Sequence, residues 1–139
     1  MLLSASPAFA AAVILPGVHV PAAQHDAANQ LLAAHTFAAD SLDAQKLLLA
    51  TGLAHVYTTA DTAALADQLY PREQQARAAN KGMWADTHHS VRTPDDMARH
   101  MNSFQIVEGV VVNVTSIKGT TYLNFGADWR RDFTAAMPS

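Results

Sequence analysis

The chain has no cysteine, and the first seventy of its 139 residues contain neither arginine nor glutamate. Without cysteine it has no disulfide framework, no thiolate zinc site and no thiol nucleophile. Charged residues make up only 15% of the chain, whereas hydrophobic residues make up 50%, which is enough to bury a core. The length suits one domain or two very small ones.

Charge is distributed unevenly along the chain. Lys46 is the only basic residue before Pro71, and five aspartates share that half with it. The eight other basic residues follow Pro71, where seven acidic residues offset them, and the total net charge is −3. A tight nucleic-acid binder carries a strongly basic face. The composition therefore predicts weak binding, if nucleic acid is a ligand at all.

The first ten residues form an apolar leader that contains Ala8-Phe9-Ala10, a small-x-small pattern of the kind that precedes secretory cleavage. The basic region and the longer apolar stretch of a signal peptide are missing. Two interpretations stay open. A signal peptide shortened at its start would place the protein in the periplasm or outside the cell, and an ordinary first strand would leave it in the cytoplasm. No stretch is long enough to predict a membrane span.

The middle of the chain is helical in pattern. In "SLDAQKLLLATG", Ser41 is a plausible N-cap and Gly52 a C-terminal stop. A short strand follows Gly52, and Asp61 can cap the next helix. Pro71 interrupts that helix, so we expect a kink or a restart there.

The last third of the chain is strand-like. Residues 87–103 are polar and predict a linker, with one helical turn after the pair Asp95 and Asp96. The residues after this linker are rich in β-branched and aromatic side chains. Lys118-Gly119 is placed as the turn of a hairpin. The segment therefore predicts a small antiparallel sheet.

Two parts of the sequence resemble a known family. Residues 47–56 read LLLATGLAHV, and a helix with Glu73 and Arg77 follows, then Gly82-Met83-Trp84. This order is similar to the LLxxGLAxV, ExxAR and GLW motifs of thermonuclease domains, the staphylococcal-nuclease-like OB-folds, and the resemblance runs from about residue 42 to 86. The tail resembles the β-module that follows such domains in many bacterial members, where EGxV, YLNFG and DFT recur.

The resemblance implies an α+β protein. Residues 11–86 would form a shortened, degenerate SNase-like OB-fold with helices. Residues 87–103 would be the linker, and residues 104–139 would form an incomplete OB-like antiparallel β-module.

The resemblance also implies where catalysis would lie. Thermonucleases cleave phosphodiesters with calcium held by carboxylates, a glutamate near the attacking water and two arginines, in motifs of the form RLxGIDxPE and DRxGR. The best match to the first motif has Ile14 for the arginine, His19 for the aspartate and Ala22 for the glutamate. Because residues 1–70 contain no Arg or Glu, no other register restores the site. We therefore predict no catalytic residue, and Ca²⁺ is implied only by the alternative of an active nuclease.

Other charged residues receive structural interpretations. Glu73 and Arg77 can pair four residues apart on a solvated helix face. His88 and His89 lie near Asp86, but adjacent histidines in a polar linker point in different directions, so no metal site is predicted. The remaining histidines before residue 60 are scattered and form no triad or HExxH arrangement.

One candidate binding site remains, at the tip of the C-terminal β-module. Trp129 beside Arg130 and Arg131, with Lys118 in the hairpin turn, could stack a base and pair with phosphates of single-stranded nucleic acid. The competing interpretation packs Trp129 on the module and pairs Arg130 with a neighbouring aspartate.

A second kind of ligand is a protein. A barrel that stops after two or three strands leaves an edge unpaired along Val110 to Val114, and such edges recruit strands. The sequence thus supports three functions: a degenerate nuclease that binds nucleic acid or a protein partner, an active calcium-dependent nuclease, and an assembly subunit that pairs or self-associates through its β-edge.

Overall fold

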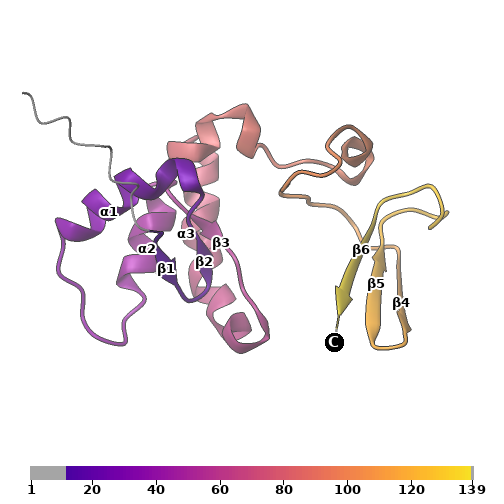
Figure 1. Ribbon diagram of the computed structural model, residues 1–139, viewed down its shortest axis with the longest axis horizontal. Coiled ribbons are helices and arrows are strands. Elements are labelled where there is room, and N and C mark those ends of the chain that lie inside the picture. The colour runs from indigo at the N-terminus through magenta and orange to yellow at the C-terminus, as the bar shows by residue number, and fades with distance from the viewer. Residues whose placement is uncertain (1–11, 139) are drawn as a thin grey trace, which may run out of the picture. The chain divides into compact units, whose positions relative to one another are not determined.

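The computed structural model describes residues 12–138, which form two compact units, one ending at Thr87 and the other beginning at His88 (Figure 1). The first combines helices with a small sheet and the second is built on a sheet, so the α+β prediction is confirmed. The leader of residues 1–10 lies outside the described residues. None of the helices in the described part of the chain is long and apolar enough to cross a membrane.

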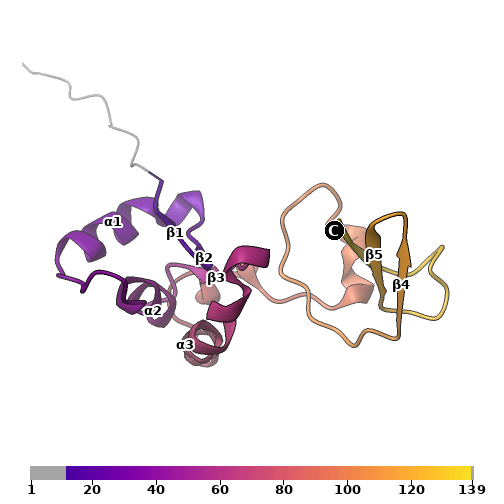
Figure 2. The ribbon, with the colours of Figure 1, turned by 90° about the horizontal axis from the view of Figure 1, so that it is seen from below.

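The first unit packs three helices against a sheet of two-residue strands (Figure 2). Its strands follow the order β1-β2-β3 and are antiparallel throughout. Its principal elements are β1 (Ile14–Leu15), β2 (Val18–His19), α1 (His25–Ala33), α2 (Asp43–Ala50), β3 (His55–Val56) and α3 (Ala66–Ala78).

The core of this unit joins the sheet to all three helices. Seven buried apolar side chains form one cluster: Val18, Val20, Ala28, Leu48, Leu49, Ala54 and Leu69. They come from β2 and the residue just after it, from α1, α2 and α3, and from the segment before β3. The helices therefore hold the short strands in place, because strands of two residues offer few ladder hydrogen bonds of their own.

Two glycine turns bring the ends of α2 and α3 together. Gly52 ends α2 as predicted, with a φ of 72°, and Leu53 N donates to Leu48 O over 3.0 Å. Gly82 follows α3 with a φ of 54°, and Met83 N donates to Gly52 O over 2.9 Å. A Cβ on Gly52 would lie 2.1 Å from the carbonyl oxygen of Lys81. Only glycine fits at this contact.

The start of α3 differs from the prediction. Thr59, and not Asp61, caps this region, because Thr59 and Thr62 form a capping box at the head of a 3₁₀ helix (Ala60–Leu65) that leads into α3. Of the kink or restart predicted at Pro71, the restart is wrong, since α3 runs through that residue. The preceding 3₁₀ helix places Pro71 in the second turn of the α-helix.

The second unit contains a three-stranded antiparallel sheet of order β4-β5-β6. Its strands are β4 (Asn113–Ile117), β5 (Thr120–Asn124) and β6 (Thr134–Pro138). The predicted hairpin turn is confirmed: Ile117 pairs with Thr120, and both turn residues have positive φ, 50° at Lys118 and 80° at Gly119. Two residues with positive φ are typical of a type I′ turn.

The segment before this sheet folds back on itself. Arg92 forms an isolated parallel bridge with Val107, and Glu108 N donates to Arg92 O over 3.0 Å. Between them a 3₁₀ helix (Pro94–Arg99) begins with a capping box at Thr93. The chain passes so close to this helix that a Cβ on Gly109 would lie 2.5 Å from Pro94 Cγ.

The second unit has little interior. Asn124, a polar residue, is the only buried side chain among its described residues, and no apolar side chain there is buried. Phe125 and Phe133 form its aromatic pair, with ring centroids 5.4 Å apart. Val110 is 81% exposed, and Val112 and Val114 are 57% exposed each. Among residues 12–138, this sheet therefore has no further strand at its β4 and β6 edges, and it carries exposed apolar side chains.

Candidate functional site

The loop between β5 and β6 is organised by its two aspartates. Asp128 N donates to the Oδ2 of Asp132 over 2.9 Å, and Asp132 N donates back to Asp128 O over the same distance. A Cβ on Gly126 would lie 2.1 Å from that Asp132 oxygen, so the carboxylate lies directly against the backbone. Both acids are thus used to fix the loop.

The three residues between these aspartates are exposed. Trp129 is 64% exposed, and the Cζ of Arg130 lies 5.0 Å from the centroid of its ring. Arg130 N donates to Asp128 Oδ1 over 3.1 Å, but neither Arg130 nor Arg131 forms an ion pair within residues 12–138. The interpretation that Trp129 packs on the module and that an aspartate pairs with Arg130 is therefore wrong. The tip presents an exposed cation–π pair.

Lys118 lies at the other end of the hairpin. Asn113 pairs with Asn124 beside the Trp129 loop, whereas Ile117 pairs with Thr120 beside the Lys118 turn. Four residue steps along β4 span about 13 Å. The structure thus brings Trp129 and Arg130 together but separates them from Lys118 by the length of the strand.

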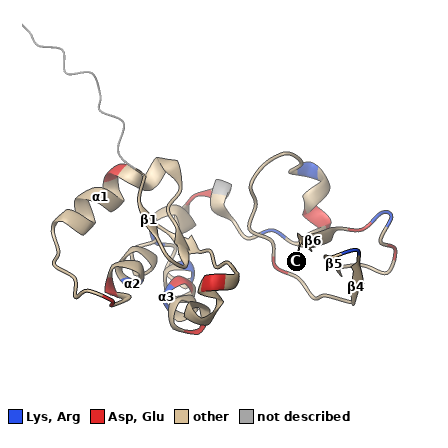
Figure 3. Ribbon diagram, turned by 60° about the horizontal axis from the view of Figure 1, so that its bottom comes forward, with Lys and Arg blue, Asp and Glu red and all other residues tan. Residues whose placement is uncertain are grey.

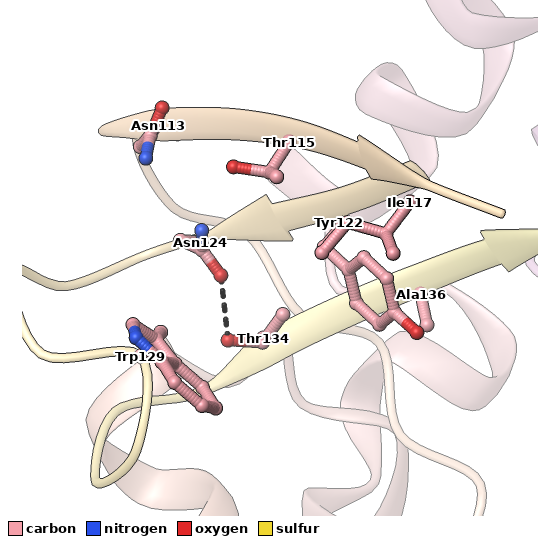
Figure 4. A pocket seen from close by; sticks show the side chains of 8 residues that line it. All are labelled: Asn113, Thr115, Ile117, Tyr122, Asn124, Trp129, Thr134 and Ala136. Carbon is pink, nitrogen blue, oxygen red and sulfur yellow. Dashed lines mark hydrogen bonds between the residues drawn. The ribbon is translucent and has the colours of Figure 1, made fainter. Parts of the chain in front are cut away.

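A groove lies between these two ends (Figure 4). It encloses about 710 Å³ and is lined by one face of the sheet and by the ring of Trp129. Its lining residues are Asn113, Thr115, Ile117, Tyr122, Asn124, Trp129, Thr134 and Ala136. All of them but Trp129 are at alternate positions along their strands, and side chains at alternate positions lie on the same face of a sheet. This two-residue period is the sequence signal that could have identified the groove. None of the lining side chains is charged.

The segment that best resembles the family's first catalytic motif has a different chemistry. Ile14, in place of the arginine, is 89% exposed, and Ala22 begins a 3₁₀ helix. His19 lies directly opposite His55 on β3, and its Nδ1 is 3.0 Å from His55 Nε2. The prediction that these histidines are scattered is therefore wrong for this pair.

These residues do not fit a calcium site. Ca²⁺ takes six to eight oxygen ligands, largely from carboxylates and carbonyls. At the position that the resemblance assigns to the aspartate, this chain has an imidazole hydrogen-bonded to a second imidazole. Within the described range, no group of three or more His, Asp or Glu side chains could hold a metal ion. No catalytic step through calcium follows from this arrangement.

The Glu73–Arg77 pair is buried, which corrects the prediction of a solvated face. Glu73 is 1% exposed, and its Oε1 lies 2.5 Å from Arg77 Nη2. Its other oxygen accepts the backbone N–H of Val56, which ties α3 to β3. The Cζ of Arg77 in turn lies 4.6 Å from the ring centroid of Trp84. The pair links helix, strand and the GMW turn, and its role is structural.

Charge gives neither unit a continuous basic face. Figure 3 shows both Lys or Arg segments and Asp or Glu segments on the ribbon of each unit. Within the second unit, five basic residues are offset by five acidic ones: Arg92, Arg99, Lys118, Arg130 and Arg131 against Asp95, Asp96, Glu108, Asp128 and Asp132. Electrostatic attraction of a polyanion must therefore be local and weak.

The first unit matches a known protein family. A family model described as staphylococcal nuclease homologue matches residues 4–86, which is more than half of the chain. The glycine turns at Gly52 and Gly82 and the buried Glu73–Arg77 pair lie inside this range. The chain belongs to this nuclease family. No curated protein and no solved structure matches it.

Proposed function

We propose that this chain is a non-cleaving member of its family that binds single-stranded nucleic acid weakly. Its binding residues are Trp129, Arg130, Arg131 and Lys118, on a β-module of residues 104–139 that follows the thermonuclease-like domain of residues 11–86 in the chain. The observation that carries the proposal is the exposed Trp129 ring with Arg130 stacked 5.0 Å from its centroid. An unpaired base can stack on the tryptophan while the arginines pair with phosphates.

The proposal that the protein does not cleave rests on the first unit. Phosphoryl transfer depends on positioning and charge stabilisation, and the loss of one such arginine can cost about a thousandfold or more. Here Ile14 and Ala22 cannot replace an arginine and a glutamate. Purified protein with calcium should leave single-stranded DNA intact. Digestion that an Asp26→Ala, Asp40→Ala variant abolishes would instead establish a rebuilt active site.

Nucleic-acid binding is tested by its dependence on salt. With three cations contacting phosphate, the logarithm of the association constant should fall with a slope of roughly −2 against the logarithm of salt concentration. Dissociation constants of about 10⁻⁴ to 10⁻⁶ M are typical of such non-specific binding. Fluorescence anisotropy of a labelled dT15 oligonucleotide between 50 and 200 mM salt measures both quantities.

The matched variants remove equal charge from different places. Arg130→Ala with Arg131→Ala should reduce the slope to about −0.7, since one cation remains. Arg72→Ala with Lys81→Ala removes two exposed cations from the first unit and should leave the slope unchanged. An equal loss in both double variants, or no loss in either, would show that the tip is not the binding site.

A second candidate function is pairing through the edge of β4. Val110, Val112 and Val114 are exposed there, and β4 has a strand neighbour on one side only. We propose that a second copy of the chain adds to this edge, because open edges with exposed apolar side chains recruit strands. Sedimentation across micromolar concentrations should show self-association that a Val112→Lys substitution weakens. A compact monomer at every concentration contradicts it.

A further inference from the structure

His19 and His55 bring two imidazoles together on the small sheet of the first unit. They face each other across β2 and β3, with His19 Nδ1 3.0 Å from His55 Nε2 and the ring centroids 4.9 Å apart. His55 is only 4% exposed, whereas His19 is exposed. One ring is therefore held inside the unit and the other borders solvent, so an ion can reach the pair from the side of His19.

The hydrogen bonds of His55 fix its tautomer. Its Nδ1 lies 3.1 Å from Val56 O, and a carbonyl oxygen can only accept, so Nδ1 carries the hydrogen. The Nε2 of the neutral ring is then an acceptor, and it receives the hydrogen bond from His19 Nδ1. Histidines that ligate metals usually donate their other ring N–H to a carbonyl or a carboxylate, which orients the ring. His55 already has this arrangement.

The distance between the two nitrogens suits neighbouring positions around one metal ion. At a metal–nitrogen distance of about 2.0–2.1 Å, ligands at a right angle are roughly 2.8–3.0 Å apart, and ligands at the tetrahedral angle roughly 3.3–3.4 Å. His19 Nδ1 and His55 Nε2 are 3.0 Å apart. Right angles between nitrogen ligands are typical of square-planar Cu²⁺ and Ni²⁺, whereas Zn²⁺ prefers a tetrahedral site.

The charge around the pair favours a cation. Residues 1–87 contain seven acidic side chains against four basic ones, which leaves a net charge of −3, and such a charge raises the local concentration of cations. The carboxylate of Glu73 accepts the N–H of Val56, next to His55, but it is 1% exposed and paired with Arg77. It is thus already used. Water must therefore complete the coordination of an ion at the two imidazoles.

We propose that His19 and His55 together bind one Cu²⁺ ion, through Nδ1 of His19 and Nε2 of His55. On binding, His19 adopts the tautomer with its hydrogen on Nε2, and its exposed ring turns to direct Nδ1 at the ion. Affinity at nitrogen sites is highest for Cu²⁺ among the first-row divalent metals, so Ni²⁺ and Zn²⁺ should bind more weakly. Ca²⁺ prefers oxygen ligands and should not bind.

NMR titration of the isotope-labelled full chain with copper sulfate tests this site. Cu²⁺ is paramagnetic, so it broadens the signals of nuclei close to it. The imidazole signals of His19 and His55 should disappear at substoichiometric copper, before those of the five other histidines. Calcium chloride should leave all of these signals in place. Isothermal titration calorimetry gives the dissociation constant for copper.

Three variants assign the affinity to the pair. Loss of a group that only orients a ligand costs about 10- to 100-fold in metal affinity, so loss of a ligand, as in His19→Ala, should cost at least about tenfold. His19→Phe should cost as much, and it serves if His19→Ala does not fold, because it keeps an aromatic ring near Tyr57. His35→Ala is the matched control, since His35 is also exposed but bonds to Leu31 O, and it should leave the dissociation constant unchanged.

The results decide the proposal without reference to nucleic acid. It is overturned if both His19 variants that fold bind copper as tightly as the parent chain, or if signals of other histidines disappear first. Binding of calcium in place of copper would also overturn it. Early loss of the His19 and His55 signals, with weaker binding in the His19 variants alone, would establish the site.

Discussion

Substitution of Glu73 by alanine should destabilise the first unit severely. The side chain is 1% exposed; one of its oxygens contacts the Arg77 guanidinium and the other accepts the backbone N–H of Val56. Alanine would leave a guanidinium that is only 20% exposed without its carboxylate. It would also leave a strand N–H without its acceptor.

The expected loss follows from these two effects. Removal of one partner from a buried ion pair lowers the free energy of unfolding by about 3–5 kcal/mol. A buried N–H left without an acceptor lowers it by about 1–3 kcal/mol. The two costs are not additive, because the same structural relaxation reduces both. We therefore expect Glu73→Ala to lower the free energy of unfolding by about 4 kcal/mol in total. At the stability per residue that is typical of globular proteins, a unit that ends at residue 87 has a free energy of unfolding of about 4–13 kcal/mol. The variant should therefore be marginal or unfolded at 25 °C.

Urea denaturation followed by circular dichroism measures this loss. Arg72→Ala is the matched control, because Arg72 is exposed on the same helix one position earlier, and it should change the free energy of unfolding by less than about 0.5 kcal/mol. Glu73→Gln keeps an acceptor for Val56 and should fall between the two. A Glu73→Ala variant as stable as Arg72→Ala would refute the buried role and restore a solvated face.

Three further predictions address single contacts. Lys118→Asn should stabilise the hairpin by about 0.5–1 kcal/mol in thermal denaturation, since Asn tolerates the φ of 50° better than Lys, and it should also lower the salt slope of dT15 binding. Gly82→Ala should cost more than about 2 kcal/mol, because its Cβ would lie 2.4 Å from Gly52 O; a loss below 1 kcal/mol would contradict that contact. The hydrogen bond from the Thr93 hydroxyl, 2.9 Å long, is the main cause that lowers the pKa of Asp96 from its usual range. The capping box should therefore be intact above the pKa of an unfolded aspartate and be lost as pH falls through the lowered pKa, and in NMR titrations Thr93→Val should move the Asp96 midpoint upward.

Local signals in the sequence predicted the local structure well. Gly52 ends a helix and Lys118-Gly119 turns a hairpin, each because the backbone there needs a positive φ. The α+β class followed from the same signals together with the family motifs.

Contacts between distant residues could not be predicted in the same way. His19 and His55 are 36 positions apart and meet only because β2 pairs with β3. Burial of Glu73 depends on the approach of β3, which helix periodicity alone does not reveal. The groove depends on how the loop folds back over the sheet, so Trp129 could be identified from the sequence but Asn124 could not.

The contact between Gly52 and Gly82 explains why two motifs of this family can be present for reasons of packing alone. Each glycine is required by the other's backbone, since a side chain on either would meet a main-chain atom of the opposite turn. The two most recognisable motifs of the chain therefore record a steric requirement between two helix ends. That requirement is unrelated to whether a phosphodiester can be cleaved. A sequence can satisfy it in full, as this one does, whichever residues it carries at the positions where the resemblance to thermonuclease domains implies arginine, aspartate and glutamate.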